Sequence, residues 1–179
     1  MCCIPYFRVE KNILKINLDL QALTDKKKES LVTAIFFGGL FIIVATVYYI
    51  HLADNLWDNL INFFMSLTLA PIPTTGISLP APIDPANHVN LYMAAFHFCL
   101  GLGLLEIAVL FLRVGLHSPV QRIAETIENI FLWLSTSFLI IAYLVNITLT
   151  GEWFVFWAGM ILILGFAFLT RALVLLAKR

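Results

Sequence analysis

Four long apolar stretches constrain this chain more than any other feature. A helix needs about 20 mostly apolar residues to cross the hydrocarbon core of a bilayer, and four segments qualify, at about 31–52, 89–113, 127–149 and 153–177. Lipid offers the backbone no hydrogen-bond partners, so each segment must be helical. Hydrophobic residues make up 61% of the chain and charged residues 12%, against about half and a quarter in soluble domains. The sequence therefore predicts an all-α membrane protein, a four-helix transmembrane bundle.

The basic residues predict the orientation of these spans. All 11 lysines and arginines lie before the first span, around the connection between the second and third, or near the end of the fourth. The intervening segments 53–88 and 150–152 contain none and carry acidic residues instead. Because basic residues concentrate on the cytoplasmic side of a membrane, we expect both ends of the chain in the cytoplasm. The prediction is a multi-pass protein of the cell membrane.

Residues 1–30 are expected to form a cytoplasmic segment ahead of a transmembrane domain that covers 31–179. Within that segment, 8–23 places apolar residues at helical spacing, which predicts an amphipathic helix on the inner leaflet. Alternating apolar and polar residues within the same stretch leave a strand as an alternative. Farther on, Ser118 and Pro119 are typical of a helix start, with the serine as the cap. The third span is therefore expected to begin in the cytoplasm.

The outer connection between spans one and two has two expected parts. Residues 55–69 are too short and too polar to span comfortably, which predicts an outer half-helix. It either lies on the outer surface or re-enters the membrane. Residues 70–88 are rich in proline, which stops a helix and favours extended backbone. We therefore expect an outer proline-rich loop.

The order of span, short helix, irregular loop and span in 31–113 resembles the pore unit of potassium-channel-like proteins. The run 74–78 (TTGIS) loosely resembles the TVGYG filter of that family, whose backbone carbonyls replace the water around an ion. The resemblance implies a constriction at Thr74, Thr75 and Gly76. The chain departs from the family by having Ile and Ser where the filter has Tyr and Gly, and by having prolines at the junction between helix and filter.

One acidic and one basic side chain fall at matching depths in two spans. Glu106 lies seven residues before Arg113, which is about 10 Å at 1.5 Å per residue, and Arg171 precedes Lys178 by the same interval. A carboxylate at that depth is costly unless it is paired or protonated. We expect an intramembrane ion pair between Glu106 and Arg171, with Arg113 as the alternative partner. A staple between spans two and four is favoured over a proton or cation relay.

The second span carries polar or small residues on two faces, so it is expected to be central. Asn90 and His97 lie on one face. His97 is expected to form a hydrogen bond across helices to Asn146 of the third span, whose depth is similar. A haem held by two histidines would need a second histidine at this depth, and no metal-ligand spacing appears. No metal or cofactor is therefore predicted.

The function is inferred from what the sequence lacks and from its membrane character. Hydrolase, Walker A and metalloprotease motifs are absent, which disfavours an enzyme. A net charge of zero implies no nucleic-acid partner. The leading hypothesis is a non-enzymatic polytopic membrane subunit or scaffold in the lipid bilayer, assembled with copies of itself or with other membrane subunits. The alternatives are an oligomeric cation channel that uses 70–88 as its constriction, and a membrane enzyme that acts on a lipid or quinone.

Overall fold

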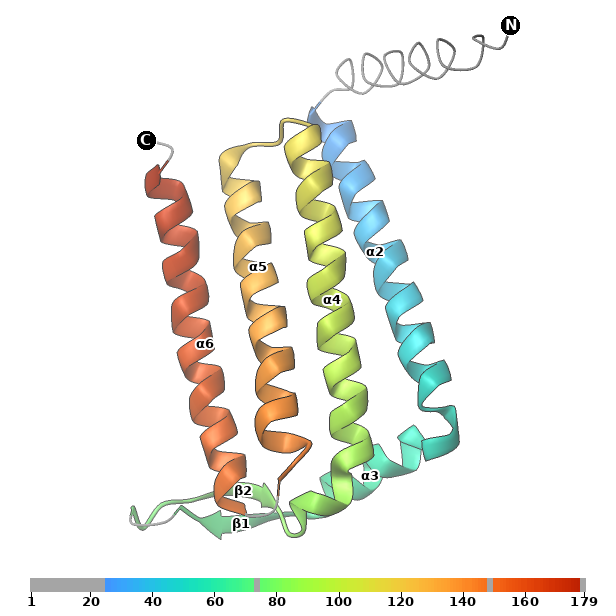
Figure 1. Cartoon of the computed structure of the whole chain (residues 1–179), viewed down its shortest axis with the longest axis vertical. Coiled ribbons are helices and arrows are strands. Elements are labelled where there is room, and N and C mark those ends of the chain that lie inside the picture. Colours follow the sequence, from blue (N-terminus) through green and yellow to red (C-terminus); the bar gives the residue numbers. More distant parts are fainter. Residues whose placement is uncertain (1–24, 73–74, 148–149, 178–179) are drawn as a thin grey trace, which may run out of the picture.

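The computed structural model describes residues 25–72, 75–147 and 150–177, and most of them are helical (Figure 1). Four helical stretches among these residues are long and apolar enough to cross a membrane, as the sequence predicts. The expected amphipathic segment 8–23 lies outside the described residues. The four long helices are α2 (Asp25–Ile50), α4 (Val89–Gly115), α5 (Val120–Leu139) and α6 (Thr150–Ala177).

The long helices stand side by side in the order α2, α4, α5, α6 (Figure 1). Helix α4 packs against both α2 and α5, which agrees with the central place expected for the second span. Glycines permit the close approaches. A Cβ atom on Gly39 would lie 2.4 Å from Leu105 of α4, and one on Gly103 would lie 2.4 Å from Leu134 of α5. Helix α5 lies between α4 and α6 along most of the row, and α4 and α6 meet at the hairpin end, where the rings of Tyr92 and Trp153 are 6.5 Å apart.

Helix α5 differs from the expectation at both of its ends. It begins at Val120 with Pro119 in the capping position and has no side-chain cap, so the prediction that Ser118 caps it is wrong. At the other end, the helix continues as the π-helical turn η3 (Ile140–Leu144), where Val145 N–H donates to the Ile140 carbonyl at 3.1 Å. The third apolar helix therefore covers Val120–Leu144 instead of extending to residue 149.

The connection between α2 and α4 folds at the end of the row opposite to the start of α2 (Figure 1). Helix α3 (Leu56–Met65) matches most of the expected half-helix 55–69, but the expectation is wrong for residues 67–69. These residues belong to β1 (Leu67–Pro71), which pairs antiparallel with β2 (Ser78–Pro82). Both strands are edges of a two-stranded sheet, where proline is tolerated. The short helices of this region are η1 (Leu52–Asp54) and η2 (Pro85–His88).

The largest buried cluster holds this hairpin against the helices. Trp153 at the start of α6 donates its indole N–H to the carbonyl of Pro80 in β2 at 3.1 Å. Around it, residues from β2, α4, η3 and α6 exclude solvent together. The buried members are Ala81, Tyr92, Cys99, Ile140, Leu144, Ile147, Trp153 and Phe156.

Candidate functional site

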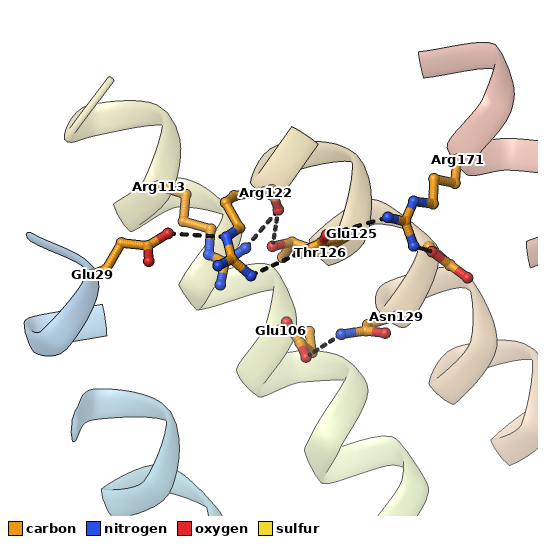
Figure 2. Close-up of polar contacts among 9 residues, drawn as sticks. Glu29, Glu106, Arg113, Arg122, Glu125, Thr126, Asn129 and Arg171 are labelled. Carbon is orange, nitrogen blue, oxygen red and sulfur yellow. Dashed lines mark hydrogen bonds and ion pairs between the residues drawn. The ribbon is translucent and has the colours of Figure 1, made fainter. Parts of the chain in front are cut away.

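Charged and polar side chains from all four long helices meet near the end of the row where α2 begins and α6 ends (Figure 2). We call this group the polar network. Its members are Glu29 of α2, Glu106 and Arg113 of α4, Arg122, Glu125, Thr126, Glu128 and Asn129 of α5, and Arg171 of α6.

Helix α5 supplies most of the network, because its polar residues recur every three or four positions on adjoining faces. Arg122 pairs with Glu29 of α2 at 3.0 Å and with Glu125 of its own helix at 3.2 Å. Arg171 of α6 reaches Glu125 at 3.2 Å and Glu128 at 3.3 Å. The Glu125 carboxylate thus bridges two arginines, and the ion pairs connect α2, α5 and α6.

Glu106 and Arg171 do not form the expected ion pair with each other, and each has a different partner. Glu106, which is only 4% exposed, accepts a hydrogen bond from the Asn129 amide at 3.0 Å. Arg171 contacts the two α5 carboxylates instead, since α5 separates its helix from α4. The alternative partner, Arg113, donates to the backbone carbonyl of Arg122 (Figure 2). Glu106 and Arg171 therefore belong to the same network without contacting each other. Each of them contacts side chains of α5.

A cavity of about 200 Å³ adjoins Glu106. It is bounded by α2, α4 and α5, and both polar and apolar side chains form its wall. Its lining residues are Val32, Thr33, Phe36, Glu106, Val109, Arg113, Glu125, Thr126 and Asn129.

The second predicted polar residue of α4, His97, lies near the opposite end of the row and meets a different partner from the one expected. Its Nδ1 lies 3.2 Å from Nε2 of His51, which is at the end of α2. His51 also contacts the Asp54 carboxylate at 2.9 Å through Nδ1. Asn90 donates to the same carboxylate at 3.5 Å. Asn146, the expected partner of His97, is exposed beyond η3.

The proposed constriction falls in the connection between the two strands. Thr75 and Gly76 are exposed there, and Gly76 has a φ of 69°, a conformation that glycine adopts readily. Thr74 lies outside the described residues. The strands on either side are paired from Leu67 with Pro82 to Pro71 with Ser78, so Thr75 and Gly76 lie in the connection of a β-hairpin.

A larger and almost wholly apolar cavity, of about 370 Å³, lies between α3, the hairpin and the start of α6. Neither this cavity nor the smaller one is lined by both Glu106 and His97. Within the described residues, no three His, Cys, Asp or Glu side chains are grouped as metal ligands. The larger cavity is lined by Phe63, Phe64, Leu67, Leu79, Pro80, Trp153, Phe154 and Trp157.

Sequence reasoning missed the contribution of α5 to the site. Glu125, Glu128 and Asn129 precede or begin the third apolar stretch, where polar residues are typical of a solvated helix start. Their spacing of three and four residues was the available signal, because it aligns carboxylates with arginines on neighbouring helices. The contact between His51 and His97 was also missed, and only the structure shows it.

The comparisons with known proteins add no functional information. No family model matches the chain, and no curated protein or solved structure is significantly similar to it.

Proposed function

We propose that the chain is an integral membrane protein with four spans and both ends in the cytoplasm, and that it acts as a non-enzymatic subunit or scaffold of a larger membrane assembly. One observation carries this proposal. In the most apolar stretch of α4, and likewise of α5, 28% of the residues are buried inside the protein. The corresponding share is only 11% in α6 and 6% in α2. The two outer helices thus leave most of their apolar surface for lipid or for other helices.

Small residues on these outer faces support contact with other helices. Gly38 of α2 and Gly165 of α6 are exposed, and a Cβ atom on either would have no neighbour within 4 Å. Glycine and alanine on one face allow the backbones of membrane helices to approach closely. The exposed small residues at helical spacing are Ala34, Gly38 and Ala45 on α2, and Ala158, Gly165 and Ala172 on α6.

The contacts of the polar network also favour a structural role. Its ion pairs join α2, α5 and α6 within one chain, which suits a protein that presents fixed outer faces. The cation-channel alternative receives less support. Its expected constriction lies in the connection between two paired strands, which differs from the unpaired carbonyls of a filter. We therefore favour assembly over conduction.

The test is the mass of the native complex after gentle detergent extraction. We expect a particle heavier than the 20.2 kDa chain, formed by several copies or by this chain with other membrane subunits. Gly165→Leu should reduce association because its side chain blocks close approach at α6, whereas Gly165→Ala, which keeps the residue small, should preserve it. A wild-type chain that is monomeric in native-like lipid discs and carries turnover on its own would overturn the proposal.

A further inference from the structure

The cavity beside Glu106 has a chemical character that the scaffold role does not require. Its volume of about 200 Å³ equals the space of roughly six or seven water molecules in the liquid, at about 30 Å³ each. It can therefore admit a small organic group. Apolar walls from α2 and α4, formed by Val32, Phe36 and Val109, face a polar side formed mainly by α4 and α5.

Glu106 presents a buried carboxylate to this cavity. Only its Oε1 atom receives a hydrogen bond from the described residues, from the amide of Asn129 at 3.0 Å. The second oxygen, Oε2, is left for another donor. Because a buried carboxylate is costly unless its oxygens are paired, the site favours a ligand that brings hydrogen-bond donors and positive charge.

The neighbouring polar groups offer further acceptors. The Thr126 hydroxyl donates to the Arg122 carbonyl at 2.9 Å, which leaves its oxygen able to accept. Asn129 uses its NH₂ group on Glu106, which leaves its side-chain carbonyl. Glu106, Thr126 and Asn129 all line the cavity. Together they match a group with several N–H donors.

Glu106 stands outside the ion pairs of the polar network. Its defining residues include four carboxylates and three guanidinium groups, the latter being Arg113, Arg122 and Arg171. Both oxygens of Glu125 are already paired with arginines. The ion pairs among the described residues use the carboxylates of Glu29, Glu125 and Glu128, so Glu106 takes part in none of them. Arg113, which lines the same cavity, donates to the Arg122 carbonyl instead.

We propose that this cavity binds a protonated primary amine, whose N–H groups donate to Glu106, Thr126 and Asn129. A primary ammonium carries three donors and one positive charge in a compact group. The amine is either a small soluble molecule or the ethanolamine headgroup of a phospholipid, because both present the same chemistry. The inference is independent of the scaffold role.

The first experiment measures thermal unfolding of the purified chain in mild detergent with ethylammonium chloride, and with tetramethylammonium chloride at equal concentration. Tetramethylammonium has the same charge but no N–H donors. Ethylammonium should raise the unfolding midpoint in a saturable way, by about 3 to 6 °C at ten times its dissociation constant. Tetramethylammonium should produce no such rise.

Variants assign the effect to the cavity. Glu106→Gln should abolish the ethylammonium shift, while Glu128→Gln should retain it, because Glu128 pairs with Arg171 and does not line the cavity. Thr126→Val, which removes one acceptor, should weaken binding about fivefold, and it serves as the test if Glu106→Gln does not fold. A wild-type shift that is equal for both salts, or a shift that survives in both Glu106→Gln and Thr126→Val, would overturn the proposal. Equal loss in Glu128→Gln and Glu106→Gln would overturn it too.

A second arm identifies the source of the amine. The chain is reconstituted in vesicles of equal phosphatidylethanolamine and phosphatidylcholine, and the lipids that remain bound are measured by native mass spectrometry. Preferential retention of phosphatidylethanolamine by the wild type, lost in Glu106→Gln, would identify the lipid headgroup. Equal retention of both lipids, together with the ethylammonium shift, would identify a soluble amine.

Discussion

At the scale of single residues, the contact between His51 and His97 joins two side chains that are 46 positions apart in the chain. The Asp54 carboxylate accepts a hydrogen bond from Nδ1–H of His51. When both imidazoles are neutral, the other nitrogen of His51, Nε2, accepts the Nδ1–H of His97. His51 therefore links the end of α2 to both η1 and α4.

The two histidines should be energetically coupled. His51→Ala should lower the free energy of unfolding by about 1 to 3 kcal/mol, because it leaves partly buried polar groups without partners. In a double-mutant cycle with His97→Ala, the coupling should be about 0.5 to 1.5 kcal/mol. The measurement is unfolding in mixed detergent micelles. The control cycle pairs His51→Ala with His88→Ala, since His88 contacts Ser66 instead, and should be additive. Additivity in both cycles would contradict the proposed link.

Adjacent glycines in α2 provide a matched test of helix packing. A Cβ atom at Gly39 would lie 2.4 Å from Leu105, whereas one at Gly38 would meet nothing within 4 Å. Alanine favours the helix by about 0.5–1 kcal/mol at either position, but overpacking at Gly39 costs about 1–3 kcal/mol. Gly39→Ala should therefore be less stable than Gly38→Ala by about 1–3 kcal/mol in the same unfolding assay. Equal stabilities would place α2 farther from α4.

At the scale of helices and strands, the sequence was sufficient for element type in the long apolar segments. Lipid-compatible length and composition determine α2, α4, α5 and α6 almost directly. The strand β1 was missed because residues 67–69 continue the apolar character of α3, and strand pairing depends on a partner that lies about ten residues away in the chain. Local pattern does not specify such a partner.

The candidate site was predictable in composition but not in pairing. Glu106 and Arg171 both have polar partners in the structure, but neither has the partner that the sequence predicted. Which partner each one meets depends on the order of the helices. Hydropathy does not encode that order, because apolar faces of similar width can pack against several neighbours.

The ion pairs of α5 with α6 should contribute more than those with α2. Arg171 and its partner Glu128 have side-chain exposures of 35% and 13%, while Arg122 and Glu29 have 48% and 46%. Less exposed pairs are more costly to break. Arg171→Gln should lower the free energy of unfolding by about 1–3 kcal/mol. Arg122→Gln should lower it by less, because that arginine is more exposed. Denaturant unfolding of both variants measures this, and a larger loss for Arg122→Gln would contradict the assignment.

At the scale of the whole molecule, the two ends of the helical row differ in chemistry. One end carries the polar network (Figure 2), and the other carries α3 and the hairpin (Figure 1). Aromatic residues line an apolar cavity at this second end. Aromatic side chains such as tryptophan favour the membrane interface. Arginines favour the cytoplasmic side. The same asymmetry that predicts orientation from the sequence therefore appears in three dimensions.

This asymmetry leads to a labelling prediction. In a chain whose native cysteines are replaced by serine, a single cysteine at Ser78 in β2 should react with a membrane-impermeant maleimide in intact cells. A single cysteine at His117, between α4 and α5, should react only after permeabilisation.

Both positions are exposed, so reactivity reports the compartment and not burial. The outer connection lacks lysine and arginine while the connection at His117 is flanked by Arg113 and Arg122, which fixes the expected sides. Reaction of both cysteines from the same side would contradict the passage of α4 through the bilayer, and the reverse pattern would invert the orientation.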